Sequence, residues 1–238
     1  MDEAKRFLRY IIPGSIFIVE STLFLLILFP AWVLNLLGHF SKSEGLGLII
    51  GTILASGALG FIFGAIHHRL SWLRNCGIDH SQVILDLMMR GIIILRETRT
   101  GDSIALDRLN RVDAWSISTA LWHSRLKTSR KISGANARAS SLTDLMHSTG
   151  TIMVACIVAL IVTAYIASPC GIGTFDKRPE SIANFLILGV IGLLLLYFHI
   201  YAYRRTLRLA QAVINEVLAD ALEQEFRELG PVNTYIPR

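Results

Sequence analysis

The sequence predicts an all-α fold: a polytopic membrane protein with four transmembrane helices, a helical cytoplasmic insert and a C-terminal cytoplasmic helix. Hydrophobic residues make up 53% of the chain and the mean hydropathy is +0.52, which excludes an ordinary soluble domain. Four apolar stretches are long enough to cross a hydrocarbon layer of about 30 Å. A soluble helix of that length would carry a polar stripe. The expected spans are residues 10–29, 46–66, 151–168 and 182–203.

The distribution of Lys and Arg predicts the orientation of these spans. Basic residues cluster before residue 10, between residues 69 and 149, and directly after residue 203. The middle stretch carries twelve Lys or Arg against seven Asp or Glu. By the positive-inside rule, both termini and this stretch face the cytoplasm, here at a cell inner membrane. The predicted organisation is a transmembrane hairpin (1–68), a cytoplasmic helical domain (69–149), a second hairpin (150–203) and a cytoplasmic helix and tail (204–238).

Small residues recur at every fourth position in the second and third expected spans. Such rows let two helix backbones approach closely, which is how helices associate in lipid. We therefore predict close helix packing along these rows, the alternative for the second span being a glycine-tolerant helix that faces lipid. The rows contain Gly47, Gly51 and Ala55; Ser56, Gly60 and Gly64; and, in the third span, Ala155, Ala159 and Thr163.

Glu20 is the carboxyl group nearest the middle of the first expected span, and Ser21 and Thr22 follow it. An ionised carboxylate at this depth is costly, so it normally faces a bundle interior, a pore or a proton path. Two interpretations are open. Glu20, with Ser21 and Thr22, lines or gates a pore, or a protonated Glu20 holds helices together by hydrogen bonds.

The middle segment predicts two helices. Asp79 followed by Gln82 resembles a capping box, which would begin a helix that continues to about Leu95. This helix is apolar nearly all round, so we expect it to be buried in an oligomer or against the membrane. A second helix should begin near residue 102 or 103 and end near Arg130. In the tail, apolar residues from Leu207 to residue 221 alternate at spacings of three and four, which indicates a short self-associating coiled coil.

A run of basic residues follows the second of these helices. It could bind an anion or a partner, or it could be the ordinary positive-inside signal that precedes a span. His67 and His68 are interpreted as interfacial anchors, because no third ligand stands at a helpful spacing. No metal and no cofactor is expected. The basic residues are Arg125, Lys127, Arg130, Lys131 and Arg138.

The stretch from Arg74 to His80 resembles the Arg-polar-His motif of HEPN-type ribonucleases. In that family the Arg and His meet across a dimer and cut RNA, so the resemblance implies a membrane-tethered ribonuclease. A second resemblance is one of size and layout alone: bacterial antiviral membrane effectors similarly combine a few spans with a cytoplasmic sensing insert.

These observations together predict a homo-oligomeric inner-membrane pore or channel, gated or recruited through its cytoplasmic domain, with a place in antiviral defence. The expected partners are the lipid bilayer, further copies of the chain, and a cytoplasmic protein or nucleotide ligand. A nucleic-acid partner and an enzymatic activity are not expected. The alternatives are a non-conducting scaffold that recruits a soluble partner, and the HEPN-like ribonuclease.

Overall fold

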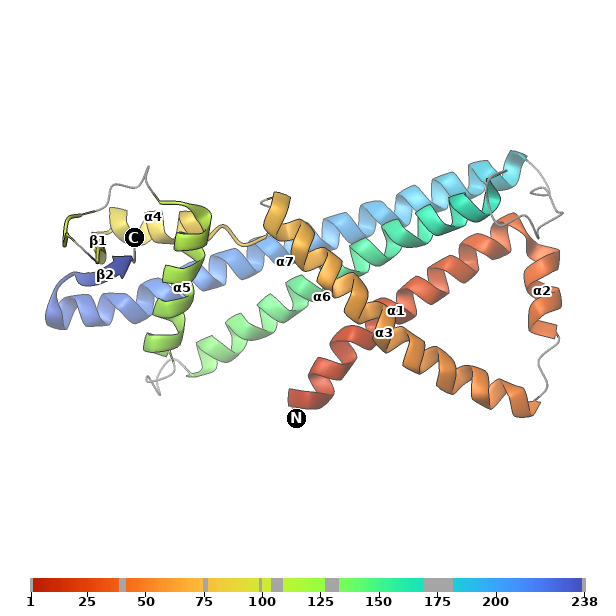
Figure 1. The fold of residues 1–238 in the computed structure, drawn as a ribbon, viewed down its shortest axis with the longest axis horizontal. Coiled ribbons are helices and arrows are strands. Elements are labelled where there is room, and N and C mark those ends of the chain that lie inside the picture. The colour runs from red at the N-terminus through yellow and green to blue at the C-terminus, as the bar shows by residue number, and fades with distance from the viewer. Residues whose placement is uncertain are drawn as a thin grey trace. The chain divides into compact units, whose positions relative to one another are not determined.

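The computed structural model describes residues 2–38, 42–74, 77–98, 100–103, 109–126, 133–168 and 182–236. Its elements follow one another as shown in Figure 1. The chain divides into two compact units. The membrane unit contains Met1–Arg74 and Asp144–Thr206, and the sheet unit contains Asn75–Thr143 and Leu207–Arg238. Arg125 lies in a helix whose side chains are not described at that point, and Lys127, Arg130 and Lys131 lie outside the described residues.

The membrane unit is built from α1 (Asp2–Leu28), α2 (Pro30–Gly38), α3 (Lys42–Arg74) and the adjoining parts of α6 (Ser133–Ala167) and α7 (Ile182–Leu229). In the described part of the chain, four helices are long and apolar enough to cross a membrane: α1, α3, α6 and α7. The prediction of a helical multi-pass membrane protein with four apolar helices is thereby confirmed.

Helix α1 runs without interruption through Pro13, although proline removes one backbone hydrogen bond from a helix. The following residue, Gly14, lies against α3: a Cβ added there would overlap the carbonyl oxygen of Ser56. Likewise a Cβ at Gly60 would overlap the carbonyl oxygen of Tyr10. The two helices therefore cross with their backbones in direct contact (Figure 1), which only glycine at these positions allows.

Two apolar clusters hold α6 and α7 against this pair. In the first, Phe24, Leu28 and Phe29 pack with Ala159 of α6 and Leu188 of α7. In the second, Phe63 of α3 packs with Val154 and Ala155 of α6. A hydrogen bond of 2.8 Å joins the hydroxyls of Thr149 and Thr206 and ties α6 to α7. The small-residue row of α6 consequently faces the interior of the unit.

The sheet unit differs from the helical expectation. Its first helix, α4 (His80–Met89), begins as predicted with Asp79 as N-cap, whose carboxylate accepts from the backbone N–H groups of Ser81 and Gln82. It does not continue to Leu95, because Gly91 takes a φ of 70°. Ile93–Glu97 form β1, which pairs in parallel with β2 (Val232–Ile236), with Ile93 opposite Val232.

The second helix of the sheet unit, α5 (Arg111–Leu126), begins later than expected, at Arg111 rather than at residue 102 or 103. Its predicted end near Arg130 lies outside the described residues. The side-chain oxygen of Asn110 accepts from the backbone N–H of Asp113 at 2.9 Å and so caps the helix start. Ser103 instead forms an isolated antiparallel bridge with Arg96.

Apolar residues of α4 and of the second half of α7 are buried within this single chain. Val83, Ile84 and Leu87 are 1% exposed or less, and Leu218 and Leu222 are fully buried. Ala210, Ile214 and Val217 of the tail stripe are buried as well. The prediction that α4 needs an oligomer or the membrane for its burial is therefore wrong. The coiled coil with another copy stays a prediction, and Ile214 and Leu218 of α7 line a small pocket of their own chain together with His80 and Ser118.

Candidate functional site

The predicted carboxylate Glu20 is buried inside the membrane unit, with only 6% of its surface exposed. It lies near the middle of the apolar stretch Arg9–Leu28 of α1. Its Oε1 atom is 2.7 Å from Nε2 of His199, which α7 contributes from within its own apolar stretch. The pair is a short hydrogen bond between two ionisable side chains on different helices.

Cys156 of α6 completes a three-residue group that we call the Glu20 site: Glu20, Cys156 and His199. One ligand-type atom from each side chain lies within 4.8 Å of the others. Cys156 is fully buried and His199 is 20% exposed. The site adjoins the cluster around Phe24 and Ala159, which stand one turn further along α1 and α6. Packing of the same three helices thus places the three polar groups together.

Several polar atoms near this depth are buried without a hydrogen-bond partner among the described residues. They include the second carboxylate oxygen of Glu20, Oε2, and the hydroxyls of Ser21 and Thr163. Because an unpaired polar atom in hydrocarbon costs free energy, such atoms mark places where a ligand, an ion or water would be stabilised.

The other two predicted pore residues are placed differently from one another. The Ser21 hydroxyl is buried, whereas Thr22 is exposed and donates back to the carbonyl of Ile18 at 2.7 Å. The Thr22 hydroxyl therefore makes its hydrogen bond within its own helix, and Thr22 does not belong to the Glu20 site.

The two predicted small-residue rows of α3 have different environments. Ser56 and Gly60 are buried against α1, and a Cβ added at Gly64 would make an ordinary contact of 3.6 Å with the ring of Tyr10. The row of Gly47, Gly51 and Ala55 is exposed, and a Cβ added at either glycine would meet no other atom within 4 Å. One row therefore serves packing within the chain, and the other is free for packing with another molecule.

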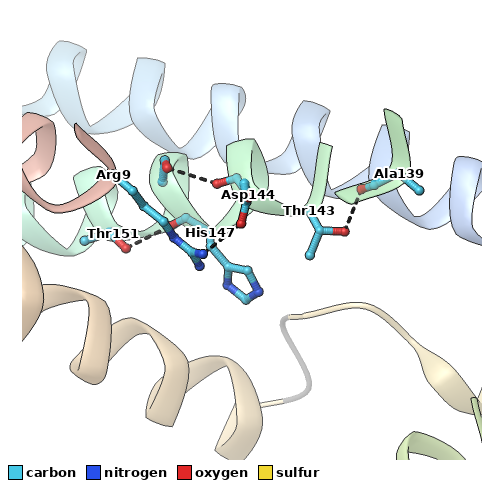
Figure 2. A network of polar contacts seen from close by, with 7 residues as sticks. Arg9, Ala139, Thr143, Asp144, His147 and Thr151 are labelled. Atoms are coloured by element: carbon cyan, nitrogen blue, oxygen red, sulfur yellow. Dashed lines mark hydrogen bonds and ion pairs between the residues drawn. The ribbon is translucent and has the colours of Figure 1, made fainter. Parts of the chain in front are cut away.

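A second polar region of the membrane unit is a cavity of about 330 Å³. The ring of His67 lies 5.3 Å from that of Tyr203 and 5.9 Å from that of His147, measured between centroids. Arg9 reaches Asp144 at 2.8 Å, beside the His147 ring (Figure 2). The residues that line the cavity are Arg9, Tyr10, Phe61, Gly64, Ala65, His67, His68, His147 and Thr151.

His147 and His199 are the functional candidates that sequence reasoning missed. Each histidine in an apolar helix was a local signal, but its partner is far away in sequence: His199 meets Glu20 across 179 positions. His147 is therefore a third histidine that lies close to His67 and His68 in the folded chain, although the spacing in the sequence did not show it.

The HEPN-like motif and the predicted basic run are described only in part. Helix α3 ends at Arg74 and α4 begins at His80, so the HEPN-like motif does not lie on one helix. His80 instead accepts or donates a 2.6 Å hydrogen bond with the hydroxyl of Ser118. Arg138 is exposed on α6. In the tail, Arg227 lowers the pKa of Glu223 through a hydrogen bond of 2.6 Å, so this acidic residue is paired one turn away.

The chain was compared with known proteins by sequence and by fold. No protein-family model, no curated protein and no solved structure matches it.

Proposed function

We propose that the protein is a channel-type protein of the cell inner membrane, in which the Glu20 site is the polar point on the conduction path. The observation that carries this proposal is the 2.7 Å pair between His199 of α7 and Glu20, which is buried near the middle of the apolar stretch of α1. Ionisable side chains at this depth are expensive and are found chiefly where ions or protons pass. A purely structural link could be made by uncharged residues at lower cost.

The burial of Glu20 within one chain supports a path inside each membrane unit. A carboxylate that lined a central pore between copies would be exposed in a single chain, but Glu20 is 6% exposed. Its free oxygen and the imidazole of His199 offer adjoining positions between which a proton or small cation could pass. Opening would then require a small separation of α1 from α6 and α7.

The sheet unit would control this opening. Helices α6 and α7 each contribute residues to both units without a break, so a change in packing in one unit can bias the other. A cytoplasmic protein or nucleotide that favours one packing would shift the population between closed and open states. In this proposal both termini and the sheet unit are cytoplasmic, following the distribution of Lys and Arg. In a role as an antiviral membrane effector, that cytoplasmic protein or nucleotide would be the trigger for opening.

A flux assay tests the role of Glu20 directly. In liposomes containing the purified protein, Glu20→Gln keeps a hydrogen bond to His199 but removes the negative charge, so we expect cation or proton flux to fall at least about tenfold. Thr22→Val is the matched control, because Thr22 is on the same helix and bonds only its own backbone among the contacts described; its flux should equal the wild type. Equal flux in Glu20→Gln and wild type would contradict the proposal.

We also propose that copies of the chain associate through the exposed row of Gly47, Gly51 and Ala55. Because a Cβ added at the exposed Gly51 meets no described atom within 4 Å, Gly51→Leu should leave the monomer folded. The larger side chain would prevent close approach of a second helix, so we expect the mass in detergent to fall to that of a monomer. An unchanged oligomer would place the interface elsewhere. A stable oligomer that never conducts would favour the scaffold function.

A further inference from the structure

The Glu20 site brings together the three side-chain types that bind transition metals in proteins. A carboxylate oxygen, a thiol sulfur and an imidazole nitrogen come from α1, α6 and α7 and lie within 4.8 Å of one another. Imidazole and thiolate together suit Zn²⁺ and similar ions, whereas Mg²⁺ and Ca²⁺ prefer oxygen ligands alone. From this grouping we infer that the site binds one Zn²⁺-type ion per chain.

An unpartnered atom within the site independently indicates a ligand. Oε1 of Glu20 is paired with His199, whereas Oε2 is buried and, among the described residues, has no partner at good hydrogen-bond geometry, the Cys156 thiol being its neighbour in the group. The side chain of Glu20 is only 7% exposed, so solvent does not satisfy this oxygen. A cation bound to Oε2 would do so.

The charge balance of the bound state favours an ion at this depth. A lone carboxylate in hydrocarbon is costly, and so is a lone divalent cation. With a carboxylate from Glu20, a thiolate from Cys156 and a neutral imidazole from His199, a divalent ion brings the total charge of the site to zero. The thiol proton and the proton shared between Nε2 and Oε1 leave as the ion binds.

The distances require only a small adjustment. Donor atoms bound to one tetrahedral Zn²⁺ are about 3.5 Å apart, given metal–ligand distances of about 2.0–2.3 Å. The Glu20–His199 distance of 2.7 Å must lengthen and the others, which are at most 4.8 Å, must shorten, by about 1 Å in each case, which side-chain rotation supplies. Three protein ligands leave the fourth position of the metal open to water or to a passing ligand.

This inference goes beyond the proposed function, because the purified protein can bind the ion whether or not it conducts. The test is a titration of the detergent-purified full chain with Co²⁺, which reports a thiolate ligand by its charge-transfer absorption. We expect one Co²⁺ per chain, displacement by Zn²⁺, and no displacement by a large excess of Mg²⁺. The cysteine background is removed with Cys76→Ser/Cys170→Ser, which should retain the signal.

Variants of each ligand complete the experiment. In the Cys76→Ser/Cys170→Ser background, Cys156→Ser should abolish the charge-transfer band, and Glu20→Gln or His199→Gln should weaken binding at least about 100-fold. Thr163→Val is the matched control, since Thr163 is buried two turns along the same helix and lies outside the group. Wild-type protein that binds no Co²⁺, or a band that survives Cys156→Ser, would overturn the inference.

Discussion

Gly60→Ala is expected to prevent α1 and α3 from packing, and it has the largest effect that we predict for a single methyl group. The added Cβ would overlap the Tyr10 carbonyl oxygen, which belongs to the backbone of α1 and cannot rotate away. The helices must therefore separate along their crossing. Overpacking of this kind costs about 3 kcal/mol or more, so little monodisperse protein should be recovered from the membrane.

The control for Gly60→Ala lies on the same helix. Gly57 is one turn earlier, and a Cβ there would make an ordinary contact of 3.9 Å with Cγ1 of Ile11. Because alanine favours helix more than glycine, Gly57→Ala should unfold at the wild-type temperature in detergent or slightly above it. Equal loss of protein in the two variants would show that the contact between α1 and α3 is not the cause.

Gly150→Ala is expected to disturb the cavity around His67. A Cβ at Gly150 would overlap the imidazole of His67, which is 3% exposed and is held between Tyr203 and His147. Either the ring turns into the cavity that it lines, which breaks its contacts with Tyr203 and His147, or α6 shifts away from α3. We expect a loss of about 1–3 kcal/mol of stability, measured as a lower thermal unfolding temperature in detergent.

A double-mutant cycle separates this contact from a general effect on α6. His67→Ala removes the ring, so adding Gly150→Ala to it should cost much less than Gly150→Ala costs in the wild type. The coupling should be about 1 kcal/mol or more, as for residues in direct contact. Additive effects would mean that Gly150 does not act through His67.

Hydropathy was sufficient to predict the four apolar helices, because a span of this length leaves a continuous local signal. Glu20 was also recognisable, since a carboxyl group within such a stretch is rare. The N-cap at Asp79 similarly depends on neighbours in sequence and is confirmed, but the backbone N–H of Asp79 donates to Gln211 and not to Gln82 as a capping box would have it. What these features share is that each is encoded within a few residues.

The parts that sequence analysis missed depend on contacts between distant segments. The apolar run Ile92–Leu95 continues the pattern of α4, but it forms a strand because residues after position 231 pair with it. Gly91 was the one local signal for this break. His199 and Cys156 were likewise not singled out in the sequence, because only folding brings them to Glu20.

Single-channel recording in planar bilayers tests the central claim most directly, with wild type and Glu20→Gln compared at the same protein mass in detergent. If the Glu20 site lies on the conduction path, the wild type should give discrete currents, and Glu20→Gln should lower the unitary conductance or the time spent open. Identical currents from the two proteins would contradict a path through Glu20, and silence from an intact wild type would contradict a channel that conducts without its trigger.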